Sequence, residues 1–253
     1  MKLLTLIIPA YNEVERITTT VGEAIEYFDR RGLVCEIIVS ADGNDGTREA
    51  ARAMSAARRE IKVIGSAERR GKGRGIRDAV AIASGDVIGF SDADNKTPIT
   101  EFDAIEPLLL QGYDAVIGSR GLRGSRIERA QPFHRRLGSR GFGLFMHAVV
   151  GLRDIVDTQC GFKFFRGEVA RELFALQQID GYMFDVEVLY LAVQQGRRIA
   201  EVPIRWRDDG DSRLEMVAGN VRNVRDVLAI RWLHRAVCDA RPQRSVPVPP
   251  ADR

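Results

Sequence analysis

The feature that most constrains the fold is an alternation of short apolar runs with longer segments of helical spacing. The apolar runs are Leu3–Ile8, Glu36–Ser40, Lys62–Ile64 and Val87–Phe90. Continuous apolar runs of this length are typical of parallel strands that are buried on both faces. Strands separated by helices pair in parallel through right-handed crossovers. The order therefore predicts an α/β fold with a mostly parallel, doubly wound sheet.

The boundaries of the first helix are predicted from single residues. Pro9 is expected to end the preceding strand, and Asn12 is expected to cap the helix. Apolar residues from Val14 to Phe28 then recur at helical spacing, and Gly32 closes the helix.

The later part of the chain continues the alternation less regularly. Patterning predicts one α/β domain over residues 1–215, an amphipathic helix over 216–240 and a disordered Pro- and Arg-rich tail over 241–253. Further strands are expected at Ala115–Gly118, Gly161–Phe165 and Ala200–Ile204, and further helices at Thr100–Leu110, Glu168–Leu176, Phe184–Gln195 and Val217–Val237.

Composition limits the compartment and the metal chemistry. The three cysteines are scattered and the three histidines do not cluster, which favours a reducing compartment and argues against a zinc site. The first apolar run is too short for a signal peptide, and no 18-residue apolar stretch occurs. The net charge of +3 is mild, and we expect no nucleic-acid partner. We expect a cytoplasmic protein, attached to a membrane only at its surface.

Two carboxylates, Asp92 and Asp94, directly follow the run Val87–Phe90. Open α/β sheets bind ligands at the carboxyl ends of their strands. Side chains two residues apart on an extended backbone lean to the same face, and paired carboxylates suit Mg²⁺ or Mn²⁺. The motif alone is weak, because a polar loop with two solvated aspartates has the same sequence.

Three other segments also fall at predicted strand ends. Pro9–Glu13 opens a helix, whose amino end can bind an anion while Tyr11 stacks on a base. Asp42 can accept hydrogen bonds from a base or ribose. The segment Gly71–Gly75 is predicted to be a flexible cationic loop, where Arg69, Arg70 and Lys72 can meet a diphosphate. Judged singly, the first two segments fit ordinary turn and cap chemistry better, and the third fits a solvated charged loop equally well.

Together these segments resemble the family 2 inverting glycosyltransferases, which have the nucleotide-sugar-binding fold called GT-A. A narrower resemblance, to the dolichyl- and other polyprenyl-phosphate glucosyl- and mannosyltransferases, rests on Asp157–Phe165, Gly118–Arg120, Glu201–Ile204 and Ser212–Leu214. The matching segments for the family are Ile7–Glu13, Glu36–Val39, Asp42–Thr47, Arg70–Gly73 and Asp92–Asp94.

The resemblance implies transfer of a hexose from a nucleotide sugar, UDP-glucose before GDP-mannose, to a polyprenyl phosphate, with inversion at the sugar. It implies Mg²⁺ or Mn²⁺ held by Asp94 with Asp92. The residues implied for nucleotide-sugar binding are Pro9, Ala10, Tyr11, Glu13, Val39, Asp42, Lys72, Asp92, Ala93 and Arg213.

The acceptor determines whether a base is needed. A polyprenyl phosphate is already ionised, whereas a sugar hydroxyl would need a general base, for which Asp185 is the candidate. With a phosphate acceptor, Asp185 is better interpreted as a helix cap. Lys163 can contact a donor or acceptor phosphate, or equally be a strand lysine that snorkels to solvent. The catalytic candidates are therefore Asp94, Asp185 and Arg120, and the candidates for holding the acceptor phosphate are Arg120, Arg135, Arg136, Arg140 and Lys163.

Two departures from the family pattern keep alternatives open. Ser40–Ala41 stand where relatives usually carry adjacent acids, and Arg213 replaces a lysine. The alternatives are a glycosyltransferase acting on a soluble hydroxyl acceptor and a catalytically weak nucleotide-sugar-binding protein. A nucleotidylyltransferase is disfavoured, because it needs a glycine-rich, Arg-containing loop where Pro9–Glu13 stands.

The expected partners are the nucleotide sugar, the polyprenyl phosphate and the inner face of a membrane, with homodimerisation left open. The basic, amphipathic segments Phe133–Val149 and Val217–Val237 are the candidates for contact with anionic headgroups. Packing of one face of these segments on the core or in a dimer interface is the alternative.

Overall fold

The computed structural model describes residues 3–127, 146, 148–207 and 218–235. Its elements are, in chain order, β1 (Leu4–Tyr11), α1 (Val14–Arg31), β2 (Cys35–Asp42), α2 (Thr47–Ala57), β3 (Ile61–Ile64), α3 (Lys72–Ile82), β4 (Val87–Ser91), η1 (Ile99–Glu101), α4 (Phe102–Leu110), β5 (Ala115–Ser119), β6 (Arg126–Ile127), β7 (Phe162–Arg166), α6 (Gly167–Leu176), α7 (Phe184–Gln194), β8 (Ile199–Pro203), β9 (Arg205–Trp206) and α8 (Ala218–Leu233).

A seven-stranded sheet forms the centre, in the order β3-β2-β1-β4-β7-β5-β8. All neighbouring strands are parallel except β7, which is antiparallel to both β4 and β5. The predicted mostly parallel sheet is confirmed. From β1 the chain adds β2 and β3 on one side and then β4 on the other. At such a switch point, a crevice forms between the carboxyl ends of the two neighbouring strands, and α/β sheets bind ligands there.

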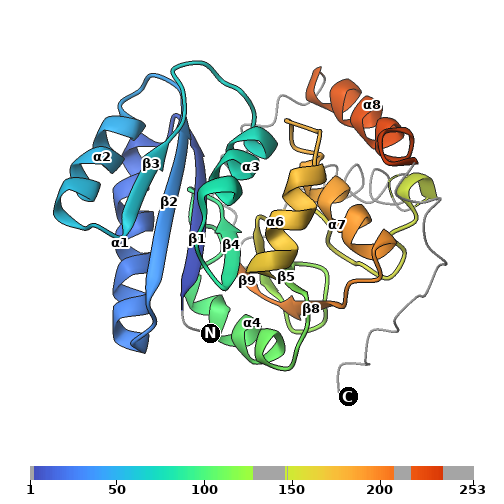
Figure 1. Ribbon diagram of the computed structural model, residues 1–253, viewed down its shortest axis with the longest axis horizontal. Helices are drawn as coiled ribbons and strands as arrows, with labels where there is room; N and C mark the ends of the chain where they lie inside the picture. Colours follow the sequence, from blue (N-terminus) through green and yellow to red (C-terminus); the bar gives the residue numbers. More distant parts are fainter. Residues whose placement is uncertain (1–2, 128–145, 147, 208–217, 236–253) are drawn as a thin grey trace.

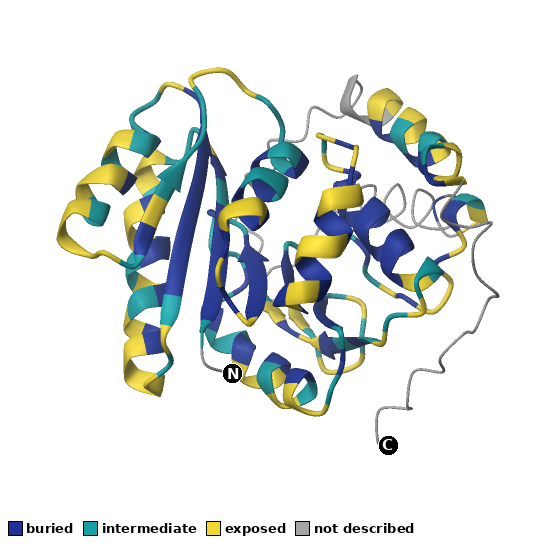
Figure 2. Ribbon diagram, in the orientation of Figure 1, coloured by how far each residue is buried: buried dark blue, intermediate teal, exposed yellow. Residues whose placement is uncertain are grey.

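Helices cover both faces of this sheet. One core cluster joins the sheet to α1, α2 and α4, and another joins it to α3, α6 and α7. Figure 2 shows the strands buried between helices whose outer sides are exposed. The doubly wound arrangement follows from strands with apolar side chains on both faces.

The first strand runs further than predicted, because Pro9 does not end it. β1 continues through Pro9 to Tyr11 and stays in register with β2. β4 pairs with β1 only as far as Ile7. Beyond that point one side of β1 has no strand neighbour, and a proline is tolerated there as on an edge strand.

The predicted cap of α1 is also wrong. Asn12 has a left-handed backbone, with φ 54°, and the capping position is Glu13. The first amides of the helix are bound across the sheet edge instead. Glu13 N donates to Thr47 Oγ1 at 2.8 Å, and Val14 N donates to Asp45 Oδ2 at 3.0 Å. The loops after β1 and β2 are thereby joined.

The segment Gly71–Gly75 is not a flexible loop, because α3 begins at Lys72. Its glycines serve close packing. A Cβ on Gly73 would lie 2.4 Å from the carbonyl oxygen of Ile179, and one on Gly75 would lie 2.7 Å from Ser40 Oγ. Glycine therefore allows the amino end of α3 to approach both β2 and the segment before α7.

The helix α8 lies within the predicted segment 216–240. A third core cluster packs it on α7 through Val227 and Ile230. No helix in the described part of the chain is long and apolar enough to cross a membrane. The division into units at 1–215, 216–240 and 241–253 stays a prediction, since 208–217 and the tail 241–253 lie outside the described residues.

Candidate active site

The acidic turn after β4 is held rigidly against its neighbours. The carbonyl oxygen of Ala93 accepts a hydrogen bond from Thr20 Oγ1 on α1 at 2.8 Å. Asn95 has φ 54°, and its amide donates to the carbonyl oxygen of Asp92 at 3.2 Å. These contacts fix Asp92 and Asp94 at the carboxyl end of β4.

Each carboxylate of this turn has a lysine beside it. Lys72 Nζ lies 2.6 Å from Asp92 Oδ1, and Lys96 Nζ lies 3.4 Å from Asp94 Oδ2. Burial and the nearby charge of Asp92 raise the pKa of Asp94 above its ordinary value. The negative charges of the two carboxylates repel each other, and a cation bound between them would offset that repulsion.

The donor set fits a divalent metal ion that also binds substrate. Carboxylate oxygens are the ligands that Mg²⁺ and Mn²⁺ prefer, and Mg²⁺ commonly takes only one or two of them from the protein. Among the described residues no group of three or more His, Cys, Asp or Glu side chains gathers around a common point. Asp92 and Asp94 would therefore leave most coordination positions to phosphate oxygens and water.

The motif predicted from Asp157–Phe165 contributes to the same turn. Gly161 packs directly on the carboxylate of Asp92, and a Cβ there would fall 2.0 Å from Asp92 Oδ2. Any larger side chain would displace the carboxylate. The glycine of this motif is thus required by the acidic turn.

A small cavity of about 70 Å³ lies beside these residues. Four of the predicted nucleotide-sugar-binding residues are among those that line it. The full lining is Pro9, Ala10, Ser40, Asp42, Arg69, Gly71, Lys72, Gly75 and Tyr182. The ends of β1 and β2 and the start of α3 therefore meet at one crevice, as the strand-end argument predicts.

A bridge of three side chains spans the crevice. The Arg69 guanidinium lies 4.4 Å from the ring centroid of Tyr11, and its Nη2 donates to the Tyr182 hydroxyl at 3.3 Å. Sequence reasoning did not find Tyr182, because no local pattern connects it to a residue 113 positions earlier.

Asp42 is held by the chain that follows β3. Its Oδ1 accepts from the amide of Ser66 at 3.1 Å and its Oδ2 from the amide of Arg70 at 2.7 Å. Asp42 is buried at the end of β2 rather than in the predicted turn. It both lines the cavity and fixes the segment that carries Arg69.

A second lysine–aspartate pair lies beneath the crevice. Lys163 Nζ on β7 lies 2.7 Å from Asp185 Oδ1 on α7, and both side chains are buried. Lys163 therefore does not snorkel to solvent. Asp185 does not cap α7 either, because the capping position is Met183. Burial raises the pKa of Asp185, although the charges of Lys163 and Lys72 oppose this.

Arg120 follows β5 and is clamped by Asp157. Its Nε and Nη2 donate to the two oxygens of that carboxylate at 2.7 and 2.9 Å. Its guanidinium carbon lies 5.6 Å from the ring centroid of Trp206, and Lys96 Nζ lies 5.9 Å from the same centroid. Arg120 is thus brought near Lys96, and through it near Asp94.

Sequence reasoning assigned no role to Lys96, Trp206 or Asp157. Asp157 opens the most specific motif of the chain, so that motif was the available signal for it. Lys96 and Trp206 lie far apart in sequence and only the fold brings them together.

The comparisons with known proteins agree with this geometry. The family model described as "Glycosyl transferase family 2" matches residues 5–174. The chain belongs to glycosyl transferase family 2. Its resemblance to this family, inferred from the strand-end motifs, is confirmed, and the protein is a glycosyltransferase.

Curated relatives of this family 2 member share most of its length. A dolichyl-phosphate beta-glucosyltransferase of Trichomonas vaginalis is 33% identical over 92% of this chain and 72% of the relative. A dolichyl-phosphate beta-glucosyltransferase of Drosophila melanogaster is 32% identical over 92% of this chain and 76% of the relative. The narrower resemblance predicted from the sequence is confirmed by these matches.

The GT-A fold predicted for the chain is confirmed by solved structures. Glucosyl-3-phosphoglycerate synthase from Mycobacterium tuberculosis, in complex with Mn²⁺, uridine diphosphate and phosphoglyceric acid, superposes with a TM-score of 0.67. The two proteins are 22% identical over 91% of this chain and 78% of the other.

The remaining predicted site residues lie away from the crevice or outside the described part of the family 2 chain. Glu13 forms an ion pair with Arg16 at 3.3 Å, and Val39 is fully buried in the core. The side chain of Val39 does not reach the cavity. Residues outside the described ranges are Arg135, Arg136, Arg140 and Arg213.

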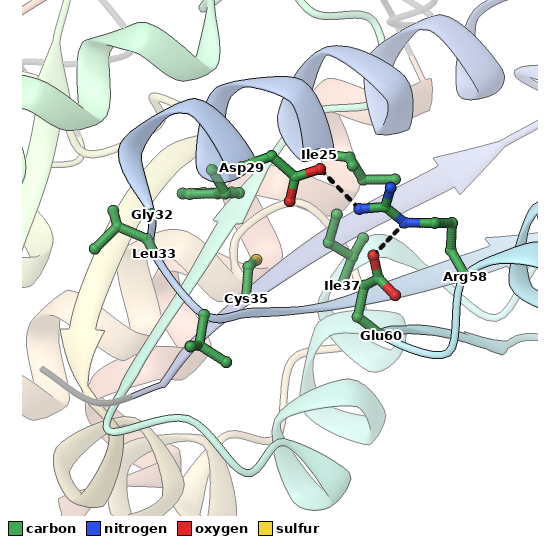
Figure 3. Close-up of a pocket in the computed structure, with 10 residues that line it drawn as sticks. Ile25, Asp29, Gly32, Leu33, Cys35, Ile37, Arg58 and Glu60 are labelled. Carbon is green, nitrogen blue, oxygen red and sulfur yellow. Dashed lines mark hydrogen bonds and ion pairs between the residues drawn. The ribbon is translucent and has the colours of Figure 1, made fainter.

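A larger hollow of about 530 Å³ lies elsewhere, between the end of α1 and the start of β2 (Figure 3). It is largely apolar, and Arg58 at its edge is paired with Asp29 at 2.9 Å and with Glu60. This is the amino end of β2, and no predicted site residue lines it. We assign it no part in the family 2 site.

Proposed function

We propose that this glycosyltransferase transfers glucose from UDP-glucose to a polyprenyl phosphate, with a divalent metal ion and with inversion at the sugar carbon. GDP-mannose is the second candidate for the sugar donor. The observation that carries the proposal is the turn of Asp92 and Asp94, with Lys72 beside it, at the edge of the crevice. The names of the curated relatives support the same acceptor class.

Donor binding begins with opening of the Arg69 bridge. Ligand pockets for molecules of this size are about 300–1,000 Å³, whereas the cavity beside Tyr11 is about 70 Å³. The base then replaces the Arg69 guanidinium on the Tyr11 ring, since both are flat groups that stack on an aromatic face. Arg69, once released, is free to meet a phosphate.

Lys72 and the acidic turn hold the diphosphate. Lys72 exchanges its contact with Asp92 for a phosphate oxygen, which places a positive charge beside the leaving group. Asp92 and Asp94 would hold Mg²⁺ or Mn²⁺, which supplies charge neutralisation for that group. The Mn²⁺ in the structure of the mycobacterial relative supports the choice of metal.

Arg120 and Lys96 position the acceptor. Both lie close to the Trp206 ring, and Lys96 also contacts Asp94, so two cations near the metal-binding turn suit a phosphomonoester. An oxygen of the ionised phosphate forms the new bond to the sugar C1. The C1–O bond to the diphosphate breaks on the opposite face and its electron pair leaves with the diphosphate, so the configuration inverts.

This chemistry needs no general base, and the pairing of Asp185 is consistent with that. A buried aspartate that accepts from a lysine at 2.7 Å is poorly placed to take a proton from an acceptor. We assign Lys163 and Asp185 to holding β7 against α7. If the acceptor were a soluble hydroxyl compound, Asp185 would have to serve as the base.

We place the reaction at the cytoplasmic face of a membrane, where a lipid phosphate and a nucleotide sugar can meet. The scattered cysteines of the sequence favour a reducing compartment, which supports this placement.

The test is a matrix of donors and acceptors. UDP-glucose, GDP-mannose and UDP-N-acetylglucosamine, each radiolabelled in the sugar, are incubated with and without polyprenyl phosphate, with Mn²⁺ or with EDTA. We expect organic-extractable label from UDP-glucose that requires both polyprenyl phosphate and metal. Absence of lipid product from every donor would overturn the polyprenyl-phosphate acceptor. Metal-dependent transfer to a soluble hydroxyl compound in the same assays would favour the alternative acceptor class.

A further inference from the structure

Lysine is scarce in this chain and concentrated at the site. Only five of the 38 basic residues are lysines. Three of the five, Lys72, Lys96 and Lys163, each contact an aspartate at the carboxyl edge of the sheet. Lys163 is buried with its aspartate, whereas Lys72 and Lys96 face the two carboxylates proposed to hold the metal ion. The kind of cation at these two positions therefore bears on how the metal site is used.

An arginine pair at the same edge shows the geometry of a persistent contact. Arg120 donates from Nε and Nη2 to both oxygens of Asp157, at 2.7 and 2.9 Å. A guanidinium holds a carboxylate with two parallel hydrogen bonds, whereas an ammonium is a point charge on a flexible stem. Lys72 contacts Asp92 through one nitrogen and one oxygen, at 2.6 Å. The contact at Asp92 can therefore be exchanged more readily than the one at Asp157.

The carboxylate of Asp92 has one oxygen to offer, and Lys72 occupies it. Oδ2 lies against the backbone of Gly161, since a Cβ on that glycine would fall 2.0 Å from it. Oδ1 is the oxygen that Lys72 Nζ contacts. The turn itself is held by the hydrogen bond from Thr20 to the carbonyl oxygen of Ala93, so Asp92 is not free to turn away. An ammonium on Oδ1 obstructs a divalent ion there and repels it as well.

Lys72 also belongs to the wall of the cavity that the donor is proposed to enter. It is the first residue of α3, and in Figure 1 the chain enters α3 at the edge of the sheet where β1 and β2 end. Its side chain is partly exposed, and its Nζ lies 5.8 Å from the ring centroid of Phe184. A diphosphate that arrives in the cavity thus meets the same ammonium that contacts Asp92.

The second carboxylate is engaged more loosely. Lys96 Nζ lies 3.4 Å from Asp94 Oδ2, which is longer than the about 2.7–2.9 Å of a charge-assisted hydrogen bond. The same Nζ lies 5.9 Å from the ring centroid of Trp206. Asp94 is therefore the more available of the two carboxylates, and the availability of Asp92 depends on Lys72.

We propose that Lys72 is an internal counter-ion that keeps Asp92 from binding the metal ion until a nucleoside diphosphate draws the ammonium away. Before the nucleotide binds, Asp94 is the single available carboxylate and holds a divalent ion weakly. When the diphosphate accepts the ammonium, Asp92 Oδ1 is uncovered and acts together with Asp94. Nucleotide and metal ion then strengthen each other's binding by the same factor. The inference rests on the proposed function in taking a nucleoside diphosphate and a divalent ion as the ligands.

The binding test needs no acceptor and no turnover. Electron paramagnetic resonance of unbound Mn²⁺ gives its dissociation constant with the full chain alone and with saturating UDP or GDP, corrected for the Mn²⁺–nucleotide complex measured without protein. We expect Lys72→Met to bind Mn²⁺ at least ~10-fold more tightly than wild type without nucleotide, because a competing cation is removed. The factor by which UDP strengthens Mn²⁺ binding should fall by about the same amount. An unchanged Mn²⁺ affinity in the folded variant would overturn the proposal.

Two further variants separate the contact from the charge. Lys72→Arg keeps the charge and offers a fork like that of Arg120, so we expect it to bind Mn²⁺ at least ~3-fold more weakly than wild type without nucleotide. Wild-type affinity in Lys72→Arg would overturn the exchange of contacts. The matched control is Lys62→Met, which removes a lysine paired with Glu36 at the amino end of the sheet. An equal gain in Lys62→Met and Lys72→Met would reduce the effect to net charge and overturn the proposal.

Nitrogen NMR of the lysine side chains follows the contact itself. The five lysines give few signals, and the signal of Lys72 is assigned from the spectrum of Lys72→Arg. We expect this signal to stay in place when Mg²⁺ is added alone and to move when UDP is added with Mg²⁺. A signal that Mg²⁺ alone moves as far would contradict the counter-ion role.

The outcomes separate this inference from the proposed reaction. Coupling of Mn²⁺ to GDP but not to UDP would leave the counter-ion role standing and refute UDP-glucose as the donor. Coupling to a nucleotide without labelled lipid from any donor would also leave it standing and refute the polyprenyl-phosphate acceptor. If neither nucleotide strengthens Mn²⁺ binding by wild type, the counter-ion role of Lys72 is overturned.

Discussion

Two lysine–aspartate pairs of almost equal geometry lie at the carboxyl edge of this sheet and differ in exposure. The Nζ–Oδ1 distance is 2.6 Å in Lys72–Asp92 and 2.7 Å in Lys163–Asp185. The side chains of the first pair are 18% and 41% exposed, and those of the second are 1% and 5% exposed. The first can exchange partners with a ligand from solvent, and the second cannot.

The difference shows why contact alone does not assign a role. A pair with access to water loses little when its partners separate, because water and ligand oxygens replace them. A sealed pair has no replacement, and separating it leaves two buried charges. We therefore assign Lys72–Asp92 to the donor site and Lys163–Asp185 to the scaffold beneath it.

The largest effect is expected where the sealed pair is broken. Lys163→Ala leaves the Asp185 carboxylate buried without its partner, and we expect a loss of about 3–5 kcal/mol in the free energy of unfolding. Denaturation in urea measures it. Lys163→Met combined with Asp185→Leu removes both charges and is expected to recover most of that loss. If the single variant unfolds at the same urea concentration as wild type, the pair is not a scaffold.

A smaller effect, on activity alone, is expected from the exposed pair. Lys72→Met removes a charge-assisted hydrogen bond to the diphosphate, and we expect a loss of about 1.5–3 kcal/mol, or a ~10- to 100-fold fall in kcat/KM for the donor. Stability should change by no more than about 0.5 kcal/mol. Steady-state kinetics and urea denaturation are measured on one preparation. An equal loss of stability in Lys72→Met and Lys163→Ala would erase the distinction between the pairs.

Arg69→Ala tests the access that distinguishes the first pair. Without the guanidinium, the Tyr11 ring and the Tyr182 hydroxyl lose the group that bridges them. A more open crevice should bind UDP faster, and a ~3- to 10-fold higher association rate is expected if opening limits entry. Stopped-flow tryptophan fluorescence with UDP measures it. Slower association in the variant would indicate that Arg69 attracts the nucleotide rather than covers its site.

The smallest effect concerns pH and a third ion pair. Burial alone would raise the pKa of Asp157, but its hydrogen bonds from Arg120 lower it below the ordinary value. A carboxyl whose pKa is lowered by folding stabilises the fold above the unfolded value of about 4. That stability is lost as the pH falls through the lower folded value. Asp157→Asn should reduce the loss in the free energy of unfolding at acid pH, which is measured by urea denaturation at a series of pH values. If the variant loses as much stability at acid pH as wild type, the Arg120–Asp157 pair is not the cause of that loss.

The parts of the fold that depend on local pattern were predictable from the sequence. Apolar runs located β1, β2 and β4, and the order of strands and helices placed the ends of β1 and β4 together. Asp92 and Asp94 therefore could be placed at the ligand crevice before any contact was known. Local caps were less predictable. Asn12 has the right chemistry for a cap, but the amides of α1 are bound by residues of another loop.

The parts that depend on distant contacts could not be predicted. The run Phe162–Arg166 shows an apolar strand but not that it inserts antiparallel between β4 and β5. That insertion buries Lys163 opposite Asp185, so a lysine expected at the surface becomes part of the core. Likewise Lys96 and Arg120 come near the same ring, that of Trp206, only through the fold.

The most direct measurement compares Asp94→Ala with Asp185→Asn in the formation of labelled lipid from UDP-glucose, Mn²⁺ and polyprenyl phosphate. We predict that Asp94→Ala, in a variant folded as wild type, lowers the rate of labelled-lipid formation about 1,000-fold, because the metal-binding carboxylate is lost. Asp185→Asn, whose amide oxygen still accepts from Lys163, should stay within about tenfold of wild type. Loss of all product in a folded Asp185→Asn variant, with activity kept in Asp94→Ala, would contradict transfer to an ionised acceptor at the acidic turn.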